Sequence, residues 1–238
     1  MLSPDQSVAS VVLDHSECAE VFKRHRIDFC CRGDASLQAA ATERGVKVDA
    51  LIDELLLAVT QRNGARVTDP RELTTPDLIA LIVSRHHDYL RRALPFVRGL
   101  AAKVSRVHAD HNPKLRDLDA AVAELSDVLL PHIDDEEETL FPRLTEMEVA
   151  PAATSKLVDE MVAEHLDVSR LLERARAAAE DFTVPDWACT SYRTLFSELR
   201  NMEADIFTHV HLENHVLRPR FAASPPEAPQ AMASGSPS

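Results

Sequence analysis

Two stretches of the chain share a pattern of residues that can bind metals. Residues 132–144 read HIDDEEETLFPRL, and residues 209–221 read HVHLENHVLRPRF. Both follow the pattern His-x3-Glu-x3-Leu-x-Pro-Arg-apolar. A single His-x3-Glu pair is expected about twice by chance in a chain of this composition, but the further agreement of leucine, proline and arginine at fixed offsets is not. The pattern therefore indicates an internal duplication.

The spacing within each copy suits a metal site inside a helical bundle. Residues four apart on a helix differ by ~40° around the axis and by ~6 Å along it, so the histidine and the glutamate share one face. The histidine can bind one metal ion while the glutamate, one turn on, reaches between two. Each copy follows a predicted helix that carries one further histidine. The predicted metal ligands are His87, His132, Glu136, His165, His209 and Glu213.

The donor types narrow the choice of metal. Ferritin-like di-iron bundles place glutamate before histidine and are rich in carboxylates, whereas here histidine leads and the site is richer in nitrogen. The set contains no cysteine, which disfavours a structural tetrahedral zinc site. A mixture of imidazole and carboxylate favours iron, with manganese and catalytic zinc as alternatives. Without any metal, the same residues would have to be buried as hydrogen-bonded His–Glu pairs, which is costly.

Several neighbours of the ligand set carry less specific expectations. His86 is the alternative to His87, because adjacent helical positions point ~100° apart and only one of the two can face the core. His211 and His215 lie off the ligand face and are predicted to be exposed. Glu164 is either a proton carrier behind a ligand or a solvated helix charge.

Two adjacent cysteines form a second candidate site. Cys30 and Cys31 lie in a predicted turn, residues 28–33, that reads DFCCRG. Thiols in such a turn can bind iron, react with nitric oxide or become oxidised; the alternative is a pair of small buried residues. Cys18, one helix away, is a candidate to join them. Cys189 has no evident partner and is predicted to belong to the core.

The elements that must position these residues are predicted to be helical. The chain has only 5 glycines among 238 residues, too few for many turns between strands, so we expect an all-α fold. Capping residues and apolar periodicity predict a small helical domain with the di-cysteine motif, a linker, an up-down four-helix bundle and a disordered tail. These parts are assigned to residues 1–66, 67–75, 76–222 and 223–238. Helices are predicted at about 3–20, 22–27, 36–44, 49–61, 75–107, 112–149, 154–180 and 185–221.

Prolines interrupt the predicted bundle helices at four positions. A proline lacks the N–H that bonds to the carbonyl four residues earlier, so each of the four is expected to bend or end its helix. They are Pro95, Pro131, Pro142 and Pro219.

Composition excludes several classes of partner. The formal net charge is −13 at pH 7, which argues against nucleic acid or an anionic membrane surface as the partner. No apolar run of about 18 residues occurs, so no membrane span is predicted. The first ten residues lack the basic and apolar regions of a secretory signal. We therefore expect a cytoplasmic protein.

At these motifs the sequence resembles the hemerythrin-like di-iron proteins, and more closely the repair-of-iron-centres (YtfE/ScdA) family. The resemblance covers about residues 5–221 and includes DFCCRG, both His-x3-Glu copies and the residues around His87 and His165. It implies a hemerythrin-like bundle with two non-haem iron ions, held by the four histidines and bridged by Glu136 and Glu213. The implied activity is the repair of iron–sulfur clusters damaged by oxidants or nitric oxide. The implied partners are damaged iron–sulfur proteins or their released iron, with the gases O2 and NO as further ligands.

One departure and two other functions complete these expectations. Ser169, four residues after His165, stands where oxygen-carrying hemerythrins have a second histidine. Its presence disfavours oxygen carriage. The first alternative function is a di-iron sensor of oxygen or nitric oxide, or a protein that reduces nitric oxide. The second is a metal-free helical interaction module. No standard catalytic constellation occurs in the sequence, and the oligomeric state and the cluster protein served stay open.

Overall fold

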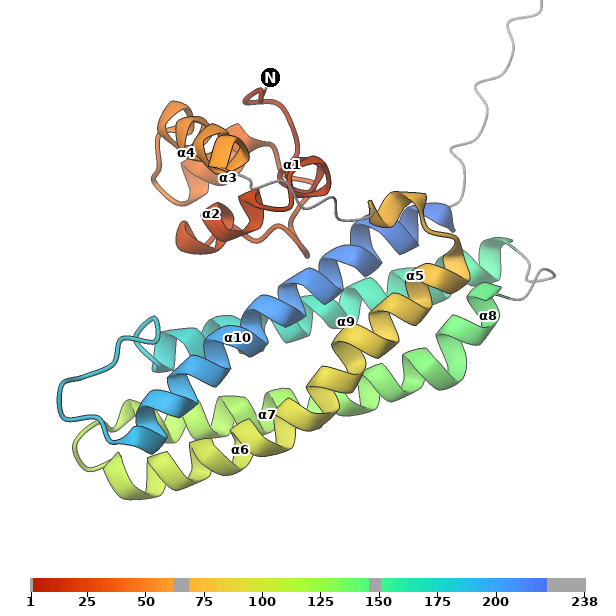
Figure 1. The fold of residues 1–238 in the computed structure, drawn as a ribbon. Helices are drawn as coiled ribbons and strands as arrows, with labels where there is room; N and C mark the ends of the chain where they lie inside the picture. The colour runs from red at the N-terminus through yellow and green to blue at the C-terminus, as the bar shows by residue number, and fades with distance from the viewer. Residues whose placement is uncertain (1, 62–68, 146–150, 222–238) are drawn as a thin grey trace, which may run out of the picture.

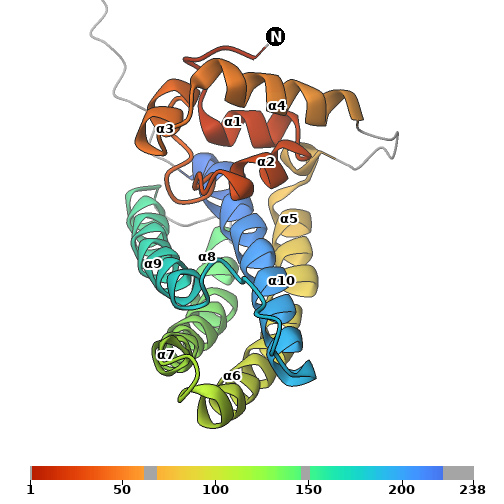
Figure 2. The ribbon, with the colours of Figure 1, turned by 90° about the vertical axis from the view of Figure 1, so that its left-hand side faces the viewer.

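The protein consists of a small helical domain seated on a long helical bundle (Figures 1 and 2). The structure is a computed structural model that describes residues 2–61, 69–145 and 151–221, with side chains described from residue 156 in the last range. Within these residues the regular structure is helical except for one isolated bridge between Ser7 and Ser36. The predicted all-α fold is confirmed. The predicted tail, residues 223–238, lies outside the described residues.

Four helices build the small domain within residues 2–61. Serine hydroxyls cap two of them: Ser7 accepts a hydrogen bond from the Ser10 N–H at the first helix, and Ser36 accepts one from the Ala39 N–H at the third. Gly45, with φ of 68°, follows the third helix, as expected of a residue that adopts this conformation without strain. The helices are α1 (Val8–Asp14), α2 (Cys18–Arg24), α3 (Leu37–Glu43) and α4 (Val48–Gln61).

The predicted helix from residue 3 to residue 20 is wrong. The chain forms α1 and α2 instead, because Ser7 rather than Ser3 caps the first helix and His15 leaves the helical conformation with φ of −142°. The predicted short helix at 22–27 is likewise replaced by α2, which ends before Arg26, a residue with φ of 55°.

The bundle contains four long helical segments that run side by side in both ribbon views (Figures 1 and 2). α6 packs against α7 and α10, and α7 packs against α9. A short 3-10 turn, η1 (Pro70–Glu72), precedes the first segment. The four segments are α5–η2–α6 (Thr75–Ile82, Val83–His87, Asp88–His108), α7–η3–α8 (Lys114–Asp135, Glu136–Leu140, Phe141–Thr145), α9 (Pro151–Ala178) and α10–η4–η5 (Thr190–Leu212, Glu213–Leu217, Arg218–Arg220).

Three of the four segments contain a π-helical turn at the position of a predicted ligand. His87 ends η2, while Glu136 and Glu213 begin η3 and η4. In η3 and η4 the residue after the turn donates its N–H to the carbonyl of that glutamate, and a proline, Pro142 or Pro219, follows directly. A proline cannot make the regular helical hydrogen bond, so a wider turn before it satisfies the backbone. No proline follows η2, and the helices continue through the prolines at 95 and 131.

The small domain and the bundle share one apolar core. Phe22, Leu51 and Leu55 of the small domain belong to the same buried cluster as residues of α6, α7, α9 and α10. Phe29 meets Phe207 of α10 edge-on, with ring centroids 5.8 Å apart. The small domain is therefore fixed on the bundle by buried side chains.

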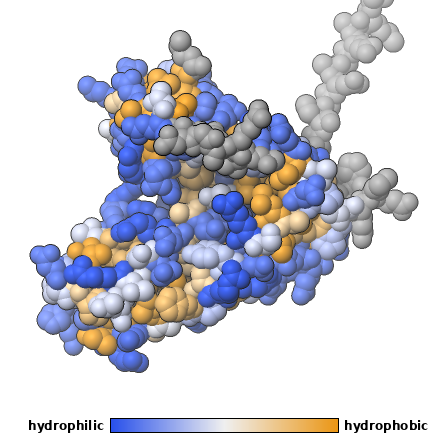
Figure 3. Space-filling model, viewed as in Figure 1, coloured by the Kyte–Doolittle hydropathy of each residue, from blue (hydrophilic) through white to orange (hydrophobic). Residues whose placement is uncertain are grey.

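The face drawn in Figure 3 is mostly hydrophilic, with scattered apolar residues. Within the described ranges, no helix combines the length and the apolar character that a membrane span requires.

Candidate metal centre

The structure brings all six predicted ligands together in the interior of the bundle. None of the six exposes more than 6% of its surface. Their donor atoms form two groups, each with all atoms within 4.8 Å of one another, and the groups share Glu136. One group consists of His87, Glu136, His209 and Glu213, and the other of His132, Glu136 and His165.

The His132–His165 pair has the geometry of two ligands on one ion. The Nε2 atoms of the two rings lie 3.1 Å apart. His132 Nδ1 contacts a carboxylate oxygen of Glu164 at 2.6 Å, and His165 Nδ1 contacts the amide oxygen of Asn214 at 2.8 Å. Both partners are acceptors, so in neutral imidazoles both Nδ1 atoms carry the proton and the two Nε2 lone pairs face each other. Two nitrogens at ~2.1 Å from one ion and at right angles would lie about 3.0 Å apart, so a cation fits between them.

The His87–His209 pair, on the other side of the glutamates, has the same spacing but a different hydrogen-bond pattern. The two Nε2 atoms lie 3.0 Å apart. His87 Nδ1 contacts Glu137 at 2.8 Å, and Arg91 Nη1 holds the same Glu137 oxygen at 2.7 Å. His209 Nδ1 has no hydrogen-bond partner within the described ranges, and its ring stacks on His86 at 5.7 Å. The donor atoms of this pair, Glu136 and Glu213 form the second group of potential metal donors.

The two glutamates lie between the histidine pairs. Both Glu136 oxygens and Glu213 Oε2 are buried without a hydrogen-bond partner in the described part of the chain. A buried carboxylate without a partner costs several kcal/mol, which a cation would offset. The nitrogen–oxygen distances are 3.3 Å for His132–Glu136, 3.4 Å for His87–Glu136, 2.8 Å for His209–Glu213 and 3.2 Å for His165–Glu213.

The pKa values of these groups reflect the crowding of buried charge. Burial and the neighbouring Glu213 raise the pKa of Glu136 well above its usual range. Burial alone would also raise the pKa of Glu213, but His209, His165 and His87 bring it well below its usual range. Burial lowers the pKa of His132 and lowers the pKa of His209 to about 4. The lowered pKa values keep His132 and His209 neutral near pH 7, as metal ligands must be.

The structure shows the surroundings of two neighbouring residues, His86 and Glu164. His86 is as buried as His87, although only one of the two was expected to face the core. It turns away from the glutamates and pairs with Asp205 at 2.9 Å between Nδ1 and Oδ1. The Glu164 side chain is 59% exposed and contacts His132 Nδ1 at 2.6 Å, so both alternatives for Glu164 stay predictions.

The prediction that His211 and His215 are exposed is wrong. His211 is 4% exposed and contacts the Phe29 carbonyl through Nδ1 at 3.1 Å. His215 Nε2 contacts the Cys30 carbonyl at 2.7 Å. The small domain covers this face of α10 and η4. A signal was present in the duplication: the first copy has Asp134 and Glu138 at the equivalent positions, and a solvated face tolerates those charges while a covered one does not.

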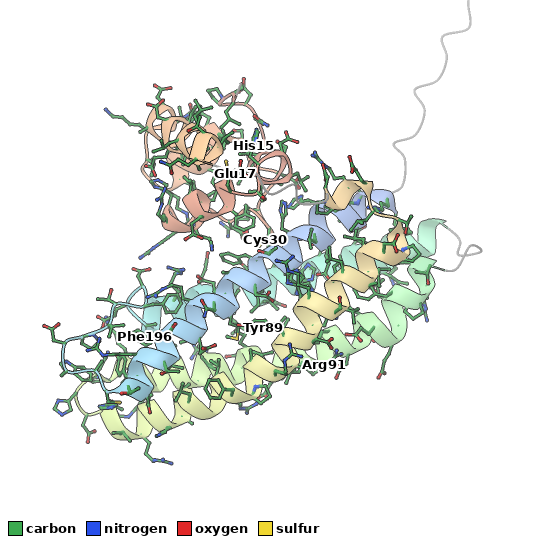
Figure 4. All side chains as sticks on the ribbon, in the orientation of Figure 1. His15, Glu17, Cys30, Tyr89, Arg91 and Phe196 are labelled. Atoms are coloured by element: carbon green, nitrogen blue, oxygen red, sulfur yellow. The ribbon has the colours of Figure 1, made fainter. Side chains whose placement is uncertain are left out.

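The cysteine loop, residues 28–33, lies where the small domain meets the bundle (Figure 4). Asp28 Oδ1 accepts hydrogen bonds from the N–H groups of Cys30 and Cys31, both at 2.9 Å. The two thiols lie 3.7 Å apart, and Cys31 Sγ contacts the backbone oxygen of His165 at 3.4 Å. Burial, together with Cys31, raises the pKa of Cys30 well above its ordinary value. Asp28, Cys30 and Cys31 form a third group of potential metal donors.

The other two cysteines do not join this loop. Cys18 contacts the Leu55 carbonyl at 3.8 Å inside the small domain, and burial raises its pKa to about 12. Cys189 was predicted to belong to the core, and this is wrong. It is exposed because it occupies the N-cap position of α10, where His108 Nε2 lies 3.2 Å from its sulfur.

Comparisons with known proteins agree with this geometry. The Hemerythrin HHE cation binding domain family matches residues 79–221, and the ScdA_N family, a domain of unknown function, matches residues 4–58. The iron-sulfur cluster repair protein ScdA of Staphylococcus haemolyticus is 31% identical over 224 residues, which cover 93% of this chain and 100% of that protein. The chain belongs to the ScdA/YtfE family of hemerythrin-like proteins. In this family, the iron-sulfur cluster repair protein YtfE of Yersinia pseudotuberculosis is 32% identical over 216 residues, covering 91% of this chain and 96% of the relative.

Membership of the ScdA/YtfE family accounts for both parts of the molecule. The hemerythrin match spans the bundle with the buried histidines and glutamates, which indicates a non-haem iron site. The ScdA_N match spans the small domain and the cysteine loop. The family resemblance expected from the sequence is confirmed.

Gly33 provides a test of how closely the cysteine loop fits the bundle. A Cβ at this position would lie 2.5 Å from the Phe29 carbonyl oxygen and 2.7 Å from His215 Nε2. We expect Gly33→Ala to lower the free energy of unfolding by ~1–3 kcal/mol, because the backbone must shift. Gly99→Ala, where a Cβ meets nothing within 4 Å, should instead stabilise α6 by up to ~1 kcal/mol. Urea unfolding of both variants checks this, and equal stability of the two would contradict it.

His211 should make stability depend on pH. Its pKa is lowered by burial to about 4 in the folded protein, against ~6.5 when unfolded. As pH falls from 7 to 4.5 the unfolded chain gains a proton that the folded protein does not, so His211 should remove about 2 kcal/mol of stability. Glu136, whose pKa is raised, acts in the opposite direction.

A comparison of variants isolates the contribution of His211. His211→Gln keeps an N–H donor for the Phe29 carbonyl and removes the titration, while Glu136 is common to both proteins. We expect the metal-free variant to lose about 2 kcal/mol less stability than the metal-free wild type between pH 7 and pH 4.5, measured by urea unfolding. Parallel pH profiles for the two proteins would show that His211 is not the group responsible.

Proposed function

We propose that this protein holds two non-haem iron ions bridged by Glu136 and Glu213, and that it repairs iron–sulfur clusters damaged by oxidants or nitric oxide. The facing lone pairs of His132 and His165, beside three carboxylate oxygens of Glu136 and Glu213 that have no hydrogen-bond partner in the described residues, are the observation that supports it best. The names of the relatives ScdA and YtfE, both iron-sulfur cluster repair proteins, support the function.

Each ion would receive two imidazole nitrogens and an oxygen from each carboxylate. One ion would lie with His132 and His165, the other with His87 and His209. Four protein donors leave positions open on an ion that prefers six, so bound iron would supply redox chemistry and sites for small ligands such as O2 or NO. Damaged iron–sulfur proteins, or the iron they release, are the proposed substrates. We place the reaction in the cytoplasm, where the thiols of the cysteine loop would stay reduced.

The residues behind the histidines have defined tasks in this proposal. Glu137 and Glu164 hold the Nδ1 protons of His87 and His132 and thereby direct each Nε2 toward the metal. The Glu164 side chain is 59% exposed, so it can exchange a proton with water. Arg91 holds Glu137 in place through Nη1.

Iron content and repair activity test the proposal. We expect two iron ions per chain after anaerobic loading with Fe2+, and restored activity of a cluster enzyme inactivated with hydrogen peroxide. His132→Gln should bind one ion, because only one histidine pair is broken, while the control His111→Gln, at the far end of the bundle, should bind two. Fewer than one ion in the wild type would contradict the proposal.

A sensor of oxygen or nitric oxide is the second candidate function. The contact between Cys31 and the backbone of His165 favours it, because a change at the metal ligand would reach the small domain directly. A sensor would bind iron and leave the inactivated cluster enzyme inactive. The repair assay therefore separates the two functions.

A further inference from the structure

The cysteine loop is fastened to only one of the two histidine pairs. We propose that Asn214 couples the loop to the metal position of His132 and His165, so that the two metal positions are not equivalent. The proposal rests on the two-metal site proposed above. The ion whose binding depends on the state of the thiols would be the one at His132 and His165.

Asn214 connects a predicted metal ligand to the cysteine loop with the two ends of one side chain. Its side chain is buried, with 5% of the residue exposed. Oδ1 accepts a hydrogen bond from His165 Nδ1 at 2.8 Å, and Nδ2 donates one to the Cys30 carbonyl at 3.1 Å. The carbonyl can only accept, so the amide has a single orientation that satisfies both contacts. The same amide thus contacts both the ring of His165 and the carbonyl of Cys30, which His215 Nε2 also contacts at 2.7 Å.

Further contacts join the loop to the helices on the same side. Cys31 Sγ contacts the His165 backbone oxygen at 3.4 Å, and Ser169 Oγ donates to Asp28 Oδ2 at 3.3 Å. Ser169 is the position where a second histidine was expected in an oxygen carrier. Among the hydrogen bonds of the described residues, the loop has none to His87 or His209.

The duplication shows that this connection is specific to the second copy. Glu137 is the equivalent of Asn214, since each directly follows a bridging glutamate. Glu137 holds His87 and is in turn bonded to Arg91 of the bundle. His87 is therefore held by a charged pair within the bundle. Its counterpart, His165, is held by an amide that is also hydrogen-bonded to the cysteine loop.

This connection makes metal binding and loop position depend on each other. If an ion at His165 favours the loop position in which Cys31 is held, the loop position favours that ion by the same factor. Engagement of the thiols by a damaged cluster or by nitric oxide would then weaken the hold on this ion. The other ion, at His87 and His209, would be affected less.

Thiol alkylation in the full chain tests the coupling. Co2+ serves as the probe, because its visible absorption reports the ligand geometry and it is stable in air. We expect two equivalents of Co2+ to slow the reaction of Cys31 with iodoacetamide at least fivefold in the wild type, measured by peptide mass spectrometry. Exposed Cys189 is the internal reference, and its rate should not change.

Asn214→Asp is the decisive variant. Aspartate keeps an acceptor for His165 but cannot donate to the Cys30 carbonyl, so two Co2+ ions should still bind with the wild-type spectrum while the protection of Cys31 falls below twofold. The matched control, Glu138→Gln, changes an exposed carboxylate of the first copy that holds no predicted ligand and should keep full protection. Chelator-induced release of Co2+ from the wild type should show two phases, and alkylation of Cys31 should accelerate one of them. In Asn214→Asp the same phase should be faster without alkylation, while the other phase should not change.

The outcomes distinguish this inference from the proposed function. Wild-type protection in Asn214→Asp, or equal loss of protection in Glu138→Gln, would overturn the coupling while leaving two bound ions. Absence of Co2+ and Fe2+ binding in the wild type would instead overturn the two-metal site itself, and the coupling with it. Loss of the wild-type Co2+ spectrum in Asn214→Asp would show that Asn214 only holds the fold of the ligand helix, which also rejects the coupling.

Discussion

Replacing Glu136 by glutamine should make the metal-free protein more stable and should abolish its binding of metal. Glu136 and Glu213 are buried side by side, and in the absence of a cation Glu136 has two oxygens without partners in the described residues. A neutral amide of the same size removes the cost of a second buried carboxylate, for which we expect ~1–3 kcal/mol of added stability. The same change removes the charged oxygens that both histidine pairs share.

Urea unfolding with and without Fe2+ measures both effects. The wild type should gain about 3 kcal/mol when free metal is a hundredfold above its dissociation constant, while Glu136→Gln should gain almost nothing. The exposed Glu138→Gln, two residues along, is the matched control and should retain the stabilisation by metal. A variant that is both less stable and still stabilised by iron would show that Glu136 is not a bridge.

Removing both thiols of the cysteine loop should abolish repair activity while leaving iron binding unchanged. In the double variant Cys30→Ser, Cys31→Ser, all six predicted ligands remain, so we expect two iron ions per chain as in the wild type. Repair of a peroxide-inactivated cluster enzyme should fall at least tenfold, because the thiols are the soft donors nearest the ligand His165.

The same assay with Cys189→Ser provides the control for general thiol chemistry. Cys189 is exposed, in contrast to the buried Cys30, and repair by this variant should equal that of the wild type. Equal repair by the double variant would exclude a direct role of the loop thiols and confine the chemistry to the bundle.

The six side chains that converge inside the bundle were predictable from the sequence because of the duplication. The two His-x3-Glu copies fix four of the six residues by spacing alone, and His87 and His165 follow from their places in the preceding helices. The long helices were also predictable, because N-caps such as Thr74 and apolar periodicity are local signals. The bundle helices accordingly lie close to their predicted ranges.

The remaining features depend on contacts between distant parts of the chain. The burial of His211 and His215 follows from the small domain that covers them, which the periodicity of α10 does not reveal. The exposure of Cys189 follows from the position at which α10 begins. The π turns at His87, Glu136 and Glu213 were not predicted either, since helical periodicity assumes a constant turn and only Pro142 and Pro219 hinted at an interruption.

The second copy of the motif, residues 209–221, contacts the small domain, whereas the first copy does not need to. The two copies are therefore not interchangeable. A chain in which residues 132–144 replaced residues 209–221 would keep every histidine and glutamate needed for metal. It would also put Asp134 against the carbonyl of Phe29, where His211 now donates. Two acceptors would then oppose each other beneath the small domain. In such a chimera the metal centre should still form, but the small domain with its cysteine loop should no longer pack on the bundle.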